Sequence, residues 1–130
     1  MKAKFQYVGI RVRDLEKSIG FYSRLLGMQV VGRSKIHETK GEVVSLESEK
    51  GGFNLELNHY DNDSPYNTPY TPGEGLDHLA FKVDDLTKAL EEAEASGHPT
   101  ILCVGVESAI VPGSEWAYIE DPDGNWIELW

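Results

Sequence analysis

The sequence predicts an α+β fold in which two βαβββ repeats form curved mixed sheets around a cleft. The first observation is an internal repeat: VGIRVRDL at 8–15 aligns with LAFKVDDL at 79–86, at an offset of 71. The second is a matching pair of later segments, FNLELN at 53–58 and NWIELW at 125–130, at an offset of 72. The third is that, in each copy, strand-like alternation passes into helical spacing. Because repeats of this kind determine the architecture, both halves are expected to fold alike.

In the first half, residues 4–12 alternate as in a strand. Asp14 is a suitable N-cap, and Gly27 a suitable C′ residue, for a helix between them. Apolar residues recur along that helix at helical spacing: Leu15, Ile19, Tyr22 and Leu26. Three strand-like runs follow, at about 28–36, 42–48 and 52–58.

The second half repeats this order. A strand at 76–83 leads to the N-cap Asp85, and the helix is expected to end at Gly97. Its apolar stripe is formed by Leu86, Leu90 and Ala93. The strands that follow are expected at 100–104, 115–120 and 125–130, with a less regular segment and an extra turn between the first two. The prediction is one domain, 1–130, with repeats at about 1–58 and 76–130 and a linker at 59–75.

Composition limits the partners of the protein. Apolar residues make up 40% and charged residues 26%, which is typical of a globular domain. The formal net charge of −10 disfavours nucleic acid and anionic membrane surfaces. The N-terminus lacks the apolar core of a signal sequence, and no apolar run is long enough to span a membrane, so we expect a cytoplasmic protein.

The repeat also places residues with oxygen or nitrogen donor atoms at equivalent positions in the two halves. Tyr7 aligns with His78, and Glu56 with Glu128, on the first and last strands of the two halves. A single Glu on a strand usually faces solvent, and a single His or Tyr is usually structural. Glu128, however, shares its face with Trp126 and Trp130, which a plain solvent-facing charge does not explain. Three oxygen donors and one imidazole suit a divalent cation such as nickel, cobalt, manganese or magnesium.

The chain resembles the vicinal oxygen chelate superfamily, and within it glyoxalase I (lactoylglutathione lyase), over nearly its whole length. The resemblance is carried by VRDLEKSIGFYSRLLGM, LELN, GLDHLAFKVDDL and EDPDGNWIEL, of which the last is the most specific. It implies a glyoxalase/bleomycin-resistance-like fold around a metal cleft. The implied metal residues are Glu56, His78, Glu128 and, where the family usually has His or Gln, Tyr7. Three roles stay open for Tyr7: it binds the metal directly, it forms a hydrogen bond to a metal-bound water, or it only fills space.

By resemblance, the reaction converts a 2-oxoaldehyde thiohemiacetal to a 2-hydroxyacyl thioester through an enediolate. Glu128 is then the principal base and Glu56 its counterpart on the other carbon face. The cofactors implied are one divalent cation per site (nickel, cobalt, manganese or zinc) and glutathione or another thiol as cosubstrate. Substrate binding is assigned to Arg11, Tyr60 and Trp126, where Tyr60 stands at a position commonly held by Asn. We expect a homodimer, whose cleft forms within one chain or between two.

Other functions of the same fold stay open at this stage. A methylmalonyl-CoA epimerase-like enzyme uses similar chemistry, although its closing motif is less similar. Extradiol dioxygenases and fosfomycin-thiol transferases generally need two His and one Glu, and Tyr7 removes one of those histidines. A metal-free antibiotic-binding protein would instead line its cleft with aromatic side chains, for which the chain offers Tyr7, Trp116, Trp126 and Trp130.

Overall fold

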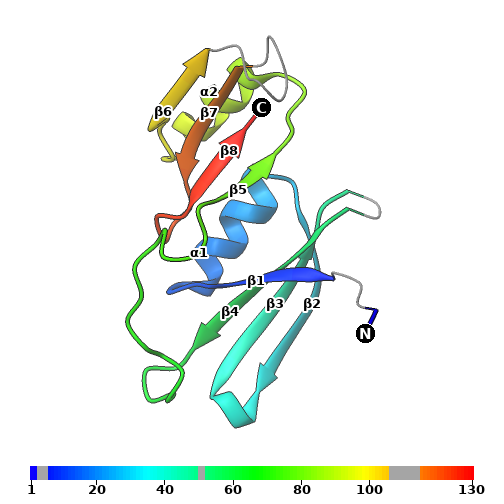
Figure 1. Ribbon diagram of the computed structural model, residues 1–130, viewed down its shortest axis with the longest axis vertical. Helices are drawn as coiled ribbons and strands as arrows, with labels where there is room; N and C mark the ends of the chain where they lie inside the picture. Colours follow the sequence, from blue (N-terminus) through cyan, green and yellow to red (C-terminus); the bar gives the residue numbers. More distant parts are fainter. Residues whose placement is uncertain (3–5, 50–51, 106–114) are drawn as a thin grey trace. The chain divides into compact units, whose positions relative to one another are not determined.

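The computed structural model describes residues 1–2, 6–49, 52–105 and 115–130, although not the side chains of 103–105 and 115–116. The chain divides into two compact units, Met1–Pro69 and Tyr70–Trp130. Each unit contains one four-stranded mixed sheet and one main helical segment (Figure 1). The predicted α+β class with two mixed sheets is therefore confirmed.

The first unit has its strands in the order β1-β4-β3-β2. The outer strand β1 pairs with β4 in parallel, and the other neighbours are antiparallel. Its elements are β1 (Tyr7–Arg11), α1 (Leu15–Ile19), the π-helical η1 (Gly20–Leu25), β2 (Gln29–Ile36), the 3-10 turn η2 (His37–Thr39), β3 (Gly41–Glu47) and β4 (Asn54–Tyr60). β4 thus continues two residues beyond the end predicted for it.

The second unit repeats this topology in the order β5-β8-β7-β6, again with a parallel pair formed by its first and last strands. Its elements are β5 (His78–Phe81), α2 (Leu86–Ala95), β6 (Leu102–Gly105), β7 (Glu115–Glu120) and β8 (Trp126–Leu129). The irregular segment predicted between the first two strands after the helix falls largely on 106–114, outside the described residues. Among the described residues, no helix is both long and apolar enough to cross a membrane.

The predicted helix boundaries follow from local chemistry. The side chain of Asp14 accepts a hydrogen bond from the backbone N–H of Lys17 at 3.0 Å, and Asp85 accepts one from Lys88 at the same distance. Each carboxylate therefore satisfies one of the N–H groups left unpaired at a helix start. Gly27 and Gly97 follow their helices with φ of +71° and +85°, a conformation that glycine adopts without steric cost.

The first helix differs from its prediction because it widens. After Ile19 the chain continues as a π-helix, in which the N–H of Leu26 reaches the carbonyl of Phe21 at 3.3 Å. Phe21 and Tyr22 are both buried there, with ring centroids 5.1 Å apart and planes at 83°. The wider turn lets two adjacent large rings enter the core, which a plain 3.6-residue pattern does not anticipate.

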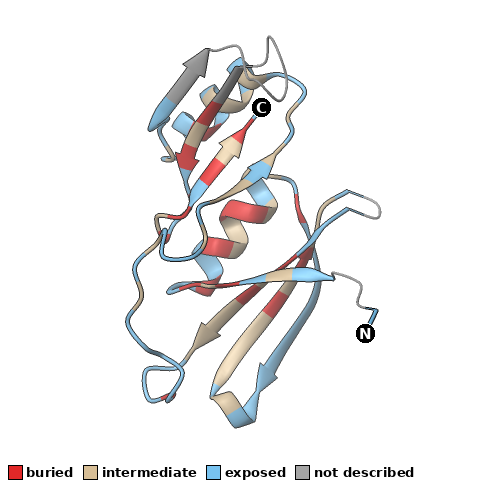
Figure 2. Cartoon of the chain, in the orientation of Figure 1, coloured by how far each residue is buried: buried red, intermediate tan, exposed pale blue. Residues whose placement is uncertain are grey.

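Each sheet uses one face for its core. In the first unit this face carries Ile10, Val44, Leu46, Leu55 and Leu57, and in the second Ala117, Ile119, Ile127 and Leu129. Figure 2 shows buried stretches along strands of both sheets and along the helical segment of the first unit, and in α2 the buried residue is Ala93. Because side chains alternate along a strand, the predicted site residues fall on the opposite, polar face of each sheet.

Candidate functional site

His78 and Glu128 meet on the polar face of the second unit. They lie on the neighbouring parallel strands β5 and β8, where Ala80 pairs with Glu128 and His78 with Trp126. The imidazole Nε2 lies 3.1 Å from the carboxylate Oε2. Both side chains are partly shielded, with exposed fractions of 33% for His78 and 20% for Glu128. The structure therefore brings together two of the predicted donors.

The other ring nitrogen of His78 is held by Asp77. Its Nδ1 lies 2.6 Å from Asp77 Oδ1. With the proton of the neutral ring on Nδ1, the Nε2 lone pair faces the carboxylate of Glu128. A proton on Nε2 or a shared cation would turn this contact between two electron-rich atoms into an attraction. A carboxylate behind a histidine is a common arrangement at metal sites, where it fixes the ring and its tautomer.

Tyr118, on β7, is a further member of this cluster. Its hydroxyl donates a hydrogen bond to Glu128 Oε2 at 2.8 Å. Its ring packs edge-on against His78, with centroids 5.6 Å apart, and tilts against Trp126 at 5.5 Å. Burial, then the hydrogen bond to the Glu128 carboxylate, raise the pKa of Tyr118 to about 12, so the phenol stays protonated at neutral pH.

The sequence analysis assigned no role to Tyr118 or Asp77. The signal for Tyr118 was present in the alternation of 115–120, since pairing this strand antiparallel to 125–130 sets Tyr118 opposite Glu128. No comparable signal identified Asp77, which is an exposed residue at the entry to β5. Trp126 is 43% exposed beside this cluster, and Trp130 stacks under Lys82, whose Nζ lies 5.2 Å from its ring centroid.

The equivalent face of the first unit carries Tyr7 and Glu56. Glu56 lies opposite Gly9 in the parallel pair of β1 and β4, and Tyr7 pairs with Asn54. A Cβ at Gly9 would come within 3.1 Å of Asn58 Nδ2 and 3.8 Å of Glu56 Oε1. The absent side chain therefore leaves room beside the carboxylate. Tyr7 is 53% exposed on the same face.

Arg11 lies further along that face and is engaged by the loop after β4. Its guanidinium donates to the carbonyl of Thr68 at 2.6 Å, to the hydroxyl of Thr68 at 3.1 Å and to Asn67 Oδ1 at 3.5 Å. It also stacks over the ring of Tyr60, 5.6 Å from the centroid. Arg11 and Tyr60, which were predicted separately, are thus in contact. A carboxylate that bound Arg11 would compete with these loop contacts.

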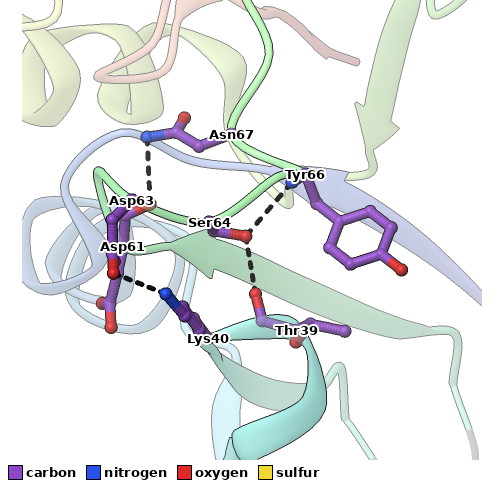
Figure 3. A network of polar contacts seen from close by, with 7 residues as sticks. All are labelled: Thr39, Lys40, Asp61, Asp63, Ser64, Tyr66 and Asn67. Atoms are coloured by element: carbon purple, nitrogen blue, oxygen red, sulfur yellow. Dashed lines mark hydrogen bonds and ion pairs between the residues drawn. The ribbon is translucent and has the colours of Figure 1, made fainter.

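The same loop is tied to the turn between β2 and β3 (Figure 3). The buried hydroxyl of Ser64 donates to the carbonyl of Thr39 at 2.6 Å and accepts from the N–H of Tyr66 at 3.2 Å. Lys40 and Asp63 form an ion pair at 2.6 Å. The predicted linker, 59–75, is therefore anchored at its start to the turn between β2 and β3.

The donor sets of the two units can be compared with what a cation needs. Within the described residues, the structure gathers no group of three or more His, Cys, Asp or Glu side chains that could hold a metal ion. The second unit supplies a nitrogen and a carboxylate, and the first a carboxylate and a phenol. Nitrogen and oxygen donors of this kind suit hard to borderline divalent cations.

Comparison with known proteins identifies the family. The model of the Glyoxalase/Bleomycin resistance protein/Dioxygenase superfamily matches residues 4–129, and the chain belongs to this family. The resemblance and the fold predicted from the sequence are thereby confirmed.

Individual relatives point to one activity within the family. The lactoylglutathione lyase of Pseudomonas aeruginosa is 32% identical over 148 residues, covering 96% of this chain and 80% of that protein. The lactoylglutathione lyase of Haemophilus influenzae is 35% identical over 125 residues, covering 92% and 86%. The structure of the trypanothione-dependent glyoxalase I of Leishmania major matches with a TM-score of 0.73 and 29% identity, over 98% of this chain and 86% of that one. These similarities support a glyoxalase-like function.

Proposed function

We propose that this protein is a metal-dependent lyase of the glyoxalase I type, which converts a 2-oxoaldehyde thiohemiacetal to a 2-hydroxyacyl thioester through an enediolate. The observation that carries the proposal is the pair formed by His78 and Glu128, with Asp77 behind the imidazole. The similarity to proteins named lactoylglutathione lyase supports the same reaction class.

The cation is assigned to donors from both halves: Glu56, His78 and Glu128, with Tyr7 as the fourth position. These donors fit nickel, cobalt, manganese or zinc, because imidazole and carboxylate ligands suit such ions. Two carboxylates that share one ion also avoid the mutual repulsion that would leave one of them protonated. When bound, the cation supplies positive charge that stabilises the substrate oxygens as they become negative.

Glu128 is the principal base in this proposal. Its carboxylate takes the proton from the carbon next to the substrate carbonyl and returns a proton to the neighbouring carbon. Glu56 is its counterpart from the other half. Such a proton transfer is efficient when the base is held within hydrogen-bond reach of the carbon acid, which a strand position on a packed sheet favours.

Binding of the substrate is assigned to Arg11, Tyr60 and Trp126. Trp126 offers an exposed apolar ring beside Glu128 and Tyr118, suited to the organic part of the adduct. Arg11 and Tyr60 are proposed to bind the thiol portion, for which glutathione or another thiol is proposed. We also propose that the protein acts in the cytoplasm as a homodimer.

The test is a comparison of the unmodified protein with Glu128→Gln after loading with Ni²⁺. With methylglyoxal mixed with glutathione or other thiols, the unmodified protein should form a thioester, measured by its ultraviolet absorbance. Glu128→Gln should lower kcat by about 10²- to 10⁴-fold, the usual contribution of a general base. The fold and much of the cation binding should survive, because the amide keeps the shape of the side chain.

Glu94→Gln is the matched control, since Glu94 is an exposed acid on α2. It should leave the rate unchanged. An unchanged rate in Glu128→Gln would remove this residue from the mechanism. Failure of the loaded protein to convert any adduct would count against the proposed reaction.

A further inference from the structure

The two halves give their glutamates different neighbours. Across the antiparallel pairs, Glu56 lies opposite Ser45 on β3, whereas Glu128 lies opposite Tyr118 on β7. Ser45 and Tyr118 therefore occupy corresponding places in the two sheets. Of these two residues, only Tyr118 has a long, rigid side chain that can reach the carboxylate opposite it.

The side chain of Tyr118 contacts the carboxylate of Glu128. Its hydroxyl donates to Glu128 Oε2 at 2.8 Å, a distance typical of a strong bond to an ionised acceptor. Its ring contacts His78, with the two planes at 82°, and Trp126, with the planes at 52°. These two ring contacts and the hydrogen bond restrain the direction of the hydroxyl.

Both contacts of Glu128 fall on the same oxygen. His78 Nε2 and Tyr118 Oη each approach Oε2, at 3.1 and 2.8 Å. Within the described part of the chain, Oε1 makes no hydrogen bond or ion pair with another side chain. The hydrogen bond from Tyr118 therefore restrains the carboxylate at Oε2 and leaves Oε1 for cation binding and proton transfer.

Glu56 has no such support. In the described ranges its side chain makes no hydrogen bond or ion pair, although the hydroxyl of Ser45 stands on the neighbouring strand. Gly9, which lies opposite Glu56, also has no side chain that could hold this carboxylate. The two acids are therefore unequal in how firmly they are oriented.

We propose that Tyr118 is a positioning residue for Glu128, whose hydroxyl fixes the carboxylate in the orientation needed for cation binding and proton transfer. The inference rests on the proposed function, and it adds a residue to which that function assigned no role. Hydrogen-bonding partners of ligating carboxylates typically change cation affinity or activity by about 10- to 100-fold when they are removed.

The experiment compares Tyr118→Phe with Ser45→Ala. Phenylalanine keeps the ring contacts with His78 and Trp126 and removes only the hydroxyl, and Ser45→Ala removes the hydroxyl at the corresponding place in the other half. The Kd for Ni²⁺ alone, measured by calorimetry, should rise about tenfold in Tyr118→Phe. In the loaded enzyme kcat should fall about tenfold while KM stays within about twofold, as expected for a group that acts on the base. Ser45→Ala should change neither value.

Circular dichroism and thermal unfolding of the cation-free proteins show whether each variant keeps its fold. A Ni²⁺ Kd and a kcat in Tyr118→Phe within about twofold of the unmodified protein would overturn the inference and leave the proposed function standing. Equal losses in Ser45→Ala would also overturn it, since they would indicate general loosening. Absence of saturable Ni²⁺ binding by the unmodified protein would overturn the proposed function and the inference with it.

Discussion

Tyr7 stands where the family resemblance implies a histidine or glutamine, on the polar face of β1 and on the same face as Glu56. In the described residues its hydroxyl has no hydrogen-bond partner, and its side chain is half exposed. A neutral phenol is a weaker ligand than imidazole. The fourth donor is therefore the weakest member of the proposed cation site.

Replacing Tyr7 by His should accordingly tighten cation binding. We expect the Kd for Ni²⁺ to fall by about tenfold, equivalent to about 1.4 kcal/mol, because imidazole is the stronger neutral ligand. Calorimetric titration measures this directly. Tyr7→Phe is the matched control, which keeps the ring and removes the oxygen. An unchanged Kd in Tyr7→His would mean that position 7 does not contact the cation.

Some residues of the candidate site were predicted from the sequence and others were not. Equivalent positions in the repeat led to His78 and Glu128, and the structure brings these two into contact. Tyr118 and Asp77 were not predicted, because their roles depend on strand register and on side-chain direction at a strand entry. Register is determined by tertiary packing and turn geometry, which single-residue patterns do not encode.

Between elements, Arg33 links three segments of the first unit. Its guanidinium, on β2, contacts Glu42 on β3 at 2.6 Å and Glu16 on α1 at 2.7 Å. The hydrogen bond from Arg33 holds the pKa of the Glu42 carboxyl below its ordinary value, more strongly than partial burial raises it. This ion pair joins an edge strand, whose side chains are all exposed, to the rest of its unit.

The sign of the resulting pH dependence follows from the lowered pKa. Glu42 contributes stability that is present above its ordinary pKa of 4.5 and is lost as the pH falls through the lowered value. In Arg33→Gln, the Glu42 pKa should return toward 4.5, as measured by NMR titration of its carboxyl carbon. Arg24→Gln removes a charge of the same sign from η1 and should leave the pKa of Glu42 lowered. A Glu42 pKa that stays low without Arg33 would contradict the assigned cause.

Elements were predicted better by type than by extent. Both helix starts and both glycine stops agree with the structure, since caps are local chemistry that the sequence displays. β5 (His78–Phe81) is shorter than the strand predicted at 76–83, and β1 ends at Arg11, one residue before its predicted end, while residues 4–5 of that prediction lie outside the described residues. The π-helical widening of the first helix was not predicted, because it depends on how Phe21 and Tyr22 pack in the core.

For the molecule as a whole, the proposed site predicts that cation binding and folding stability are linked. A ligand present at 100 times its Kd stabilises the folded state by about 2.7 kcal/mol, which for this length corresponds to roughly 10 °C in Tm. Ni²⁺ should therefore raise the Tm of the unmodified protein, as measured by calorimetry, and fail to do so in His78→Ala.

Glu91→Gln controls for general attraction of cations to a chain with a net charge of −10, since Glu91 is exposed on α2. It should keep the full Tm increase. An equal increase in His78→Ala would show that Ni²⁺ stabilises the protein by binding elsewhere.

The parallel pairing of first and last strands has a consequence for how activity is acquired. In the second unit, His78 and Glu128 come from opposite ends of the segment Tyr70–Trp130 and become neighbours only when β8 pairs with β5. Such distant closures are entropically costly and tend to form late. On the proposed function, a nascent or partly folded chain would thus lack the pair of His78 and Glu128 until β8 pairs with β5.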